Sequence, residues 1–304
     1  MESDSDWLTG VSKGDFHDHY ILGDVIGRGS VSTVCSCLYK GKKKYACKII
    51  RKVQSSKVET RARIQTLLRI RHENIVSVRE AYDDPQRLYL VEDLAAGGEL
   101  LEKLASRGGY SEKDAADAVR DALSALRYLH EMGLHHGSVR PEKLLYATED
   151  ENSKLLLTDM GVAAPVINCY NALYCAPEVT STRSSSSASD IWSLGVVIYI
   201  MLCGFEPFRE MQEIFPAPYW DDKTDEAKHL ITQLMQTNPE DRPTAQELLR
   251  DPWVRGVDTA RHSMTDAAKK LCEFNARRKF KAATHVVRAA HRAIAFSHFH
   301  EEGT

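Results

Sequence analysis

Apolar residues change their spacing along this chain. In the first hundred residues they come in short runs bounded by glycine and polar residues, a pattern typical of β-strands. A spacing of three and four residues around Ile64 and Leu67 predicts one helix among these runs. The predicted strands cover residues 20–26, 31–34, 45–50, 75–78 and 88–91.

Beyond residue 98 the pattern becomes mainly helical. One apolar stripe covers residues 115–129, and Ser111, with Asp114 three residues later, is placed to cap the start of its helix. Strands first and helices later indicate an α+β protein with two lobes and a boundary near 94–97. Further helices are predicted at 189–203, 224–236, 244–250 and 264–296.

Length and composition fit an ordinary soluble globular protein, with 304 residues of which 43% are hydrophobic. The sequence contains no stretch of about 18 apolar residues, so we expect no membrane span. The acidic start, Met1 to Asp4, does not resemble a secretory signal. Seven cysteines lie apart from one another, without the paired spacing of a zinc site, which favours reduced thiols and a cytoplasmic location.

The charge is unevenly distributed. The net charge is −3, but residues 255–292 contain ten Lys or Arg against three Asp or Glu, a local charge of +7 that leaves the rest of the chain near −10. A basic tail on an acidic body suggests a segment that docks on its own protein or on an acidic partner; the alternative is a merely solvated helix. We expect protein partners and no nucleic acid.

One segment carries most of the chemical information. Residues 136–145 read HGSVRPEKLL and are similar to the catalytic loop of protein kinases, H-R-D-L-K-P-E-N-L-L. In that loop the Asp accepts the proton of the substrate hydroxyl and the Asn holds a magnesium ion. Ser138 and Lys143 stand at those positions here. A hydroxyl without a partner is no general base at neutral pH, and an ammonium group repels a metal cation.

Other protein kinase motifs follow in the family's order over about residues 20–255. The resemblance implies the bilobal kinase fold: a disordered N-terminus (1–18), a small mainly-β N-lobe (19–95), a larger helical C-lobe (96–256) and a basic regulatory tail (257–304). It is strongest for the calcium/calmodulin-dependent group. The motif residues are Gly27 and Gly29 of the phosphate-covering loop, Lys48 of V-A-I-K, Asp159 of D-F-G, Glu178 of A-P-E, Asp190 and Gly195 of the large buried C-lobe helix, and Arg242, the expected ion-pair partner of Glu178.

The departures from the family pattern concern catalysis. The helix-C glutamate that pairs with the β3 lysine in kinases falls on Arg63. The gatekeeper of the adenine pocket, apolar or threonine in kinases, is Glu92. A carboxylate there needs a partner or a raised pKa. We therefore hypothesise that Glu92 replaces the missing carboxylate in a Lys48–Glu92–Arg63 network.

The substrate side is altered too. The activation segment, residues 159–178, is several residues shorter than in calmodulin-dependent kinases and contains Asn171 where the family has a threonine. It offers no Ser or Thr for phosphorylation between Gly161 and Pro177. The substrate-docking helix that follows Phe208 in the family is expected to be largely absent.

Nucleotide binding is a separate matter. Lys143 could place its ammonium group where a metal would sit, permitting contact with ATP without a metal. Glu92 and Ser32, which replaces the third glycine of the phosphate-covering loop, favour weak or absent binding. ATP thus stays open as a cofactor, and Asp159 would be the sole ligand for magnesium. The positions that match the family's nucleotide pocket are Gly27, Gly29, Val34, Ala46, Lys48, Glu92, Glu99, Leu145 and Asp159.

Residues 272–283 are similar to the segment that follows the kinase domain in calcium/calmodulin-dependent protein kinase II and in the calmodulin-kinase-like domain of guanylate-kinase scaffold proteins. In those relatives the helix blocks the substrate cleft and binds calmodulin. A basic amphipathic helix with bulky anchors suits calmodulin; the alternative is a regulatory helix fixed permanently on the C-lobe. The residues concerned are Arg277, Arg278, Lys279, Phe280, Val287 and Ile294.

These features favour a catalytically impaired kinase homologue, a pseudokinase, that acts as a signalling or scaffold module through protein contacts. The alternative is a Ser/Thr kinase with residual activity that uses Asp159 as its only metal ligand. A third interpretation is an inhibitor that competes for the partners of a true kinase.

Overall fold

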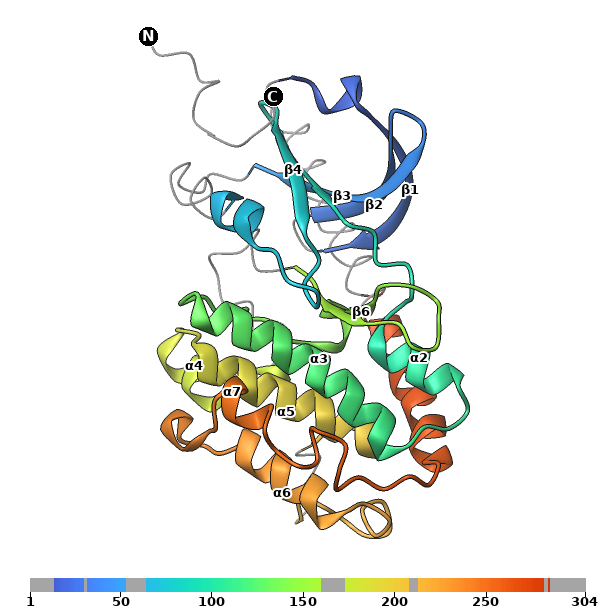
Figure 1. Cartoon of the computed structure of the whole chain (residues 1–304), viewed down its shortest axis with the longest axis vertical. Helices are drawn as coiled ribbons and strands as arrows, with labels where there is room; N and C mark the ends of the chain where they lie inside the picture. Colours follow the sequence, from blue (N-terminus) through green and yellow to red (C-terminus); the bar gives the residue numbers. More distant parts are fainter. Residues whose placement is uncertain are drawn as a thin grey trace, which may run out of the picture.

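The computed structural model describes residues 14–29, 32–52, 64–159, 173–207, 213–281 and 284. It has the bilobal protein kinase architecture, an antiparallel sheet above a helical lobe (Figure 1). The five strands are ordered β1-β2-β3-β5-β4, and each adjacent pair is antiparallel. They are β1 (Tyr20–Arg28), β2 (Ser32–Tyr39), β3 (Lys43–Arg51), β4 (Val78–Asp83) and β5 (Arg87–Glu92).

The N-lobe begins earlier than the polar N-terminal sequence suggested. Phe16–Asp18 form a 3-10 helix capped by Asp15, and Phe16 is buried. Its ring stacks on Tyr89, with 4.7 Å between ring centroids, and on Tyr20 at 5.1 Å. The expected disordered segment 1–18 was therefore wrong for residues 14–18, because a single aromatic side chain anchors this stretch to the sheet.

The predicted strand at 75–78 was misplaced. β4 starts only at Val78, while Ile75 makes an isolated parallel bridge to Leu157. The Val76 amide also donates to the carbonyl of Leu157 at 3.0 Å. This apolar run is buried because it crosses to the C-lobe, and burial rather than sheet pairing explains its composition.

Helices form most of the C-lobe. The helix after Ser111 begins as predicted, because Ser111 and Asp114 form a capping box. In α5 almost every residue is buried, and a Cβ at Gly195 would lie 2.9 Å from the Cβ of Leu234 in α6, so the close packing of α5 against α6 depends on that glycine. The helices are α2 (Leu100–Ser106), α3 (Glu112–Glu131), α4 (Pro177–Thr182), α5 (Ser187–Cys203), α6 (Asp225–Leu234) and α7 (Ala245–Leu248).

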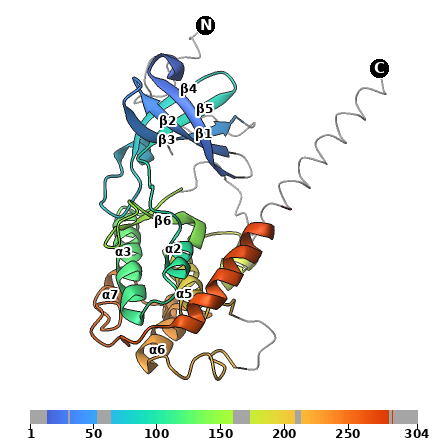
Figure 2. The ribbon, with the colours of Figure 1, turned by 90° about the vertical axis from the view of Figure 1, so that its right-hand side faces the viewer.

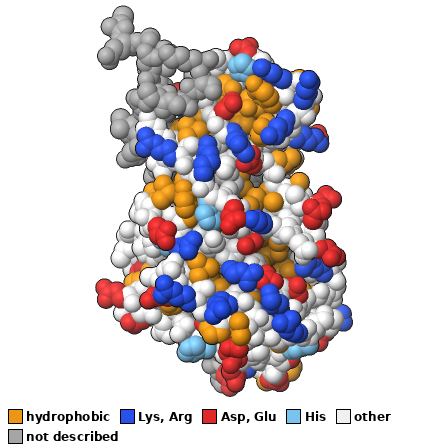
Figure 3. All heavy atoms as spheres, in the orientation of Figure 1, with side chains coloured by type: hydrophobic (Ala, Val, Ile, Leu, Met, Phe, Trp, Pro, Cys, Tyr) orange, Lys and Arg blue, Asp and Glu red, His pale blue; other side chains and the backbone are white. Residues whose placement is uncertain are grey.

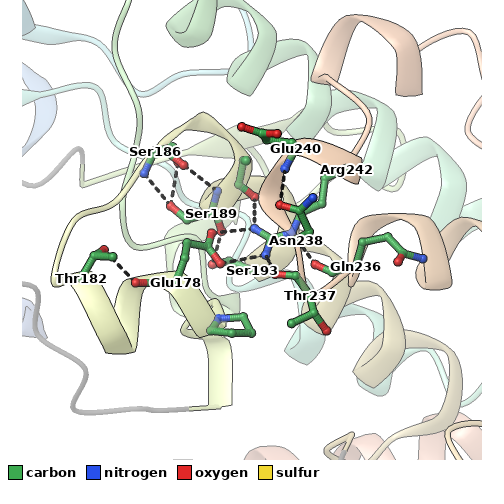
Figure 4. A network of polar contacts seen from close by, with 12 residues as sticks. Glu178, Thr182, Ser186, Ser189, Ser193, Gln236, Thr237, Asn238, Glu240 and Arg242 are labelled. Atoms are coloured by element: carbon green, nitrogen blue, oxygen red, sulfur yellow. Dashed lines mark hydrogen bonds and ion pairs between the residues drawn. The ribbon is translucent and has the colours of Figure 1, made fainter.

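One ion pair ties the end of the activation segment to the rest of the C-lobe (Figure 4). The guanidinium of Arg242 donates to both carboxylate oxygens of Glu178, at 2.7 and 2.8 Å. Arg242 also donates to the carbonyls of Gln236 and Ala188, at 2.8 and 2.9 Å. The predicted pairing of Glu178 with Arg242 is confirmed.

The basic tail continues as a helix over residues 265–281, here called the tail helix. Its apolar face recurs every three to four residues and is part of the C-lobe core. The buried residues of this face are Ala267, Ala268, Leu271 and Phe274, preceded by Met264. Figure 2 shows the tail helix lying obliquely across the C-lobe beside α2.

Charged side chains of both signs are interspersed over the two lobes on the face shown in Figure 3. Within the described parts of the chain, no helix has the length and apolar character needed to cross a membrane.

Candidate functional site

Three charged residues meet between the lobes. The ammonium groups of Lys48 and Lys143 each form a hydrogen-bonded ion pair with Asp159, Lys48 with Oδ1 and Lys143 with Oδ2. The side chains of Lys48 and Lys143 are 5% and 19% exposed, and that of Asp159 is 27% exposed. Both oxygens of the Asp159 carboxylate thus accept from lysine.

Regular structure brings these residues together. Lys48 lies in β3, opposite Val34 of β2 and Leu90 of β5. Lys143 ends a short 3-10 helix, Pro141–Lys143, that leads into β6 (Leu144–Tyr146). Strand β6 pairs with β7 (Leu155–Leu157), so the hairpin returns the chain to Asp159, and the Thr158 amide donates to the carbonyl of Lys143 at 2.9 Å.

The ion pairs decide the charge state of Asp159. Burial alone would raise the pKa of this carboxyl group, but the two ammonium groups and their hydrogen bonds hold its pKa well below the usual range. Asp159 is therefore an anion at every physiological pH, and its charge is neutralised within the protein. Its backbone has a φ of 63°, a conformation that few residues other than glycine adopt.

Glu92 faces this group from the last position of β5, where it pairs with Ala46 of β3. The residue is buried, and burial raises its pKa to about 7, with Asp159 adding to the effect and Lys48 and Lys143 opposing it. In the hypothesised Lys48–Glu92–Arg63 network, Lys48 was expected to pair with Glu92. In the structure its ammonium group donates to Asp159 instead. Arg63 lies outside the described residues.

The catalytic loop keeps the architecture of a kinase. Asp190 of α5 accepts from the backbone amides of His136 and Gly137, at 2.8 and 2.7 Å. The buried His136 bonds through Nε2 to the carbonyl of Thr158 at 3.0 Å, and its Nδ1 accepts from the Ser138 amide at 3.2 Å. The loop is held firmly, yet the residue presented at the general-base position is a serine.

The remaining predicted nucleotide positions lie on the strands around these charges. Gly27 pairs with Val34 in the β1–β2 hairpin, and the Gly29 amide donates to the carbonyl of Ser32 at 2.8 Å. Leu145 lies in β6 and bridges to Glu99. These contacts concern the backbone, so nucleotide binding itself stays a prediction.

Glu99 makes a contact that the sequence did not predict. Its carboxylate accepts from Arg278 of the tail helix, and the same guanidinium donates to Glu142 of the catalytic loop at 2.9 Å. The neighbouring Lys279 pairs with Glu102 of α2. The basic tail therefore docks on an acidic part of its own protein, one of the two alternatives that the charge distribution left open. The charge imbalance was the signal, but it could not name the acidic partners.

The other tail positions differ in their surroundings. Arg277 is exposed and donates within its helix to Glu273 at 3.1 Å. Phe280 is 73% exposed although it belongs to a large aromatic residue type that normally seeks burial. Val287 and Ile294 lie outside the described residues, as do Asn171 and most of the activation segment.

A pocket not predicted from the sequence lies between the catalytic loop and the end of the activation segment. It is a hollow open to solvent and is lined among others by Ser138, Arg140, Tyr174, Cys175 and Ser185. Tyr174 is 3% exposed, and burial raises the pKa of its hydroxyl group above the ordinary value. Ser138 thus borders a hollow lined by hydroxyl groups and the guanidinium of Arg140, and no carboxylate is among the lining residues that the structure describes.

Comparison with known proteins agrees with the kinase architecture. The protein kinase domain model matches residues 20–254, so the chain belongs to the protein kinase domain family. Among its curated relatives, calcium/calmodulin-dependent protein kinase type IV of Homo sapiens is 38% identical over 315 aligned residues, covering 97% of this chain and 66% of the relative. Calcium/calmodulin-dependent protein kinase type 1 of Macrobrachium nipponense is 34% identical, covering 89% and 86%, and that of Caenorhabditis elegans is 35% identical, covering 88% and 84%. The chain spans just under two thirds of the length of the human and rat type IV kinases.

The kinase family implies magnesium at this site, and the residues present do not fit it. A divalent cation needs free oxygen ligands, whereas both oxygens of Asp159 accept from ammonium groups and Lys143 stands at the position of the second ligand. Among the described residues, no group of three or more His, Cys, Asp or Glu is arranged to hold a metal ion.

Proposed function

We propose that this chain is a catalytically impaired protein kinase homologue, a pseudokinase, that acts in signalling as a binding module through protein contacts. The observation that carries the proposal is the closure of Asp159 by Lys48 and Lys143. In a kinase this carboxylate holds the metal that bridges the phosphates, and the lysine at position 48 contacts those phosphates. In this protein the two groups satisfy each other, with Lys143 as the second partner.

Ser138 supports the same conclusion. Loss of a positioned general base costs about 10² to 10⁴ in rate. Loss of the metal ligand at position 143 adds to this, although such effects are not additive. From an ordinary kinase turnover of about 1–100 s⁻¹, loss of the general base alone leaves about 10⁻⁴ to 1 s⁻¹, and loss of the metal ligand lowers the rate further.

A second candidate function is a Ser/Thr protein kinase with residual activity. Two observations favour it: the relatives at 34–38% identity are named protein kinases, and Lys48 and Asp159 are both retained. In this alternative the ion pairs of Asp159 open when a metal–nucleotide complex binds, and Ser138 only positions the substrate.

Phosphate transfer separates the two functions. The purified chain is incubated with γ-labelled ATP, magnesium and a generic basic peptide, with the curated type 1 relative as a positive control. We expect the same incorporation for wild type as for Asp159→Asn, because neither can hold the metal productively. Incorporation by wild type clearly above that of Asp159→Asn would reject the pseudokinase and favour residual kinase activity.

We further propose that calmodulin regulates the tail. The names of the relatives include calmodulin, and the tail helix offers basic residues next to the exposed Phe280. The first half of the helix belongs to the C-lobe core, so calmodulin would take the part from about residue 278 onward and would have to break the ion pairs of Arg278. Titration with Ca²⁺-loaded calmodulin tests this; absence of binding at micromolar concentration would favour a permanently fixed helix.

A further inference from the structure

The net charge of the residues that meet between the lobes differs from that of a metal-dependent site. Lys48 and Lys143 contribute two positive charges, Asp159 contributes one negative charge, and Glu92 contributes another only when ionised. The net charge of these four side chains is therefore +1 when Glu92 is protonated and zero when it is ionised, without any metal. In a kinase the β3 lysine pairs with the helix-C glutamate, and magnesium ions held by the D-F-G Asp and the catalytic-loop Asn neutralise the phosphates.

We propose that the site formed by Lys48, Lys143 and Asp159 binds a nucleoside triphosphate free of divalent cation, with the ammonium group of Lys143 in the place of the metal. The inference deepens the proposed function, on which it rests, by naming the ligand of a site that transfers no phosphate. Lys143 is held at the site by the 3-10 helix Pro141–Lys143 and by its ion pair with Asp159.

The two lysines keep donors for such a ligand. An ammonium group has three N–H donors, and the bond to Asp159 uses one on Lys48 and one on Lys143. The remaining donors can meet phosphate oxygens while Asp159 keeps both ammonium groups in place. Lysine is an established phosphate-binding residue, acting as a point charge.

A divalent cation is disfavoured at the same place. It would approach a carboxylate already neutralised by two ammonium groups and would stand beside the positive charge of Lys143. Magnesium bound to the phosphates would also neutralise the charge that attracts the ligand to the lysines. Added magnesium should therefore weaken binding in this protein.

The test is thermal unfolding of the full chain with ATP, first in EDTA and then with magnesium at matched ionic strength, together with calorimetric titration of the same samples. We expect ATP in EDTA to raise the Tm by several degrees when it is in large excess over Kd. We expect the affinity to fall as magnesium is added. Binding that requires magnesium, or no binding at millimolar ATP in EDTA, would overturn the inference.

Lys143→Asn provides the decisive comparison, because it restores the amide that the kinase motif has at this position. In EDTA its affinity for ATP should fall roughly tenfold to a hundredfold through loss of a charge-assisted contact. Magnesium should then improve its binding, the reverse of wild type, because Asp159 has lost one of its ammonium partners. Lys154→Asn is the matched control, since Lys154 pairs with Glu73 on the surface and is 57% exposed.

The outcomes also separate this inference from the proposed function. If Lys143→Asn behaves like Lys154→Asn, Lys143 does not replace the metal, and the inference fails while the pseudokinase stands. Phosphate transfer by wild type would reject the pseudokinase even if ATP binds without metal. Folding of Lys143→Asn is checked by its Tm without ligand.

Discussion

Arg278 of the tail helix donates to Glu142 of the catalytic loop at 2.9 Å, and the same guanidinium pairs with Glu99 before α2. The side chain of Arg278 is 15% exposed, and the carboxylates of Glu99 and Glu142 raise its pKa against the effect of burial. A charge near the end of the tail helix is thus matched to two acids that lie 136 and 179 positions away in the sequence. The relationship fixes where the tail helix meets the catalytic loop.

Reversing this charge should release the end of the tail helix. Arg278→Glu removes the partner of two half-buried carboxylates and adds a third, so we expect a loss of about 1–3 kcal/mol in the free energy of unfolding. Hydrogen exchange of the amides at 275–281 should become faster while that of α5 changes little. Arg277→Glu is the control, because Arg277 is 63% exposed and its ion pair among the described residues is with Glu273 of its own helix. Equal exchange in the two variants would contradict the docking.

Phe280 should matter for calmodulin and not for folding. Its side chain is 73% exposed, so Phe280→Asp should change the free energy of unfolding by no more than about 0.5 kcal/mol. If Phe280 is a calmodulin anchor, the same variant should bind Ca²⁺-calmodulin at least roughly tenfold more weakly. Val257→Asp is a matched control, an exposed apolar residue (63%) outside the tail helix. Identical titration curves for both variants would remove Phe280 as an anchor.

The sequence predicted the elements that depend on local patterns. The strand around Lys48 and the capped start of α3 could be located because alternation, turns and the Ser111–Asp114 pair act over a few residues. The pairing of Glu178 with Arg242 followed from family motifs. The 3-10 helix at Phe16 was missed, since one aromatic residue in a polar stretch gives no periodic signal.

The site was predictable in its residues and not in its contacts. Lys143 and Asp159 stand out because they occupy motif positions, and their unlike charges make a pairing reasonable. That Asp159 holds both lysines depends on the β6–β7 hairpin, which has only three residues in each strand and gives a weak sequence pattern. The acids that receive Arg278 depend on how the tail helix packs, which is set by tertiary contacts.

The ion pair between Glu178 and Arg242 should be a major source of C-lobe stability. The Arg242 side chain is completely buried, so Glu178→Ala leaves a buried charge without its counter-ion. We expect a loss of about 3–5 kcal/mol in the free energy of unfolding, measured by urea denaturation. Glu73→Ala breaks an ion pair whose two side chains are more than half exposed, so it should change the free energy of unfolding far less. Similar losses in both variants would show that burial of Arg242 is tolerated without Glu178.

Glu92 should make stability fall as the pH rises. Its pKa is about 7 in the folded protein, because burial disfavours the anion, against an ordinary value of 4.5. Between these two values the folded state binds more protons than the unfolded state, so the free energy of unfolding decreases with pH over this window, by about 3 kcal/mol in total. Glu92→Gln removes this contribution while it keeps the shape of the side chain.

The measurement is urea denaturation of wild type and Glu92→Gln at a series of pH values from 5 to 8. The other titrating groups, including Asp159 with its lowered pKa, are common to both proteins, so the difference between the two curves isolates Glu92. We expect the variant to gain stability over wild type steadily as the pH rises, and the difference to level off above pH 7. A difference that does not change with pH would mean that Glu92 is ionised over the whole range. That would require a cation in addition to Lys48 and Lys143 to stabilise its carboxylate, and Arg63 would again be the expected partner.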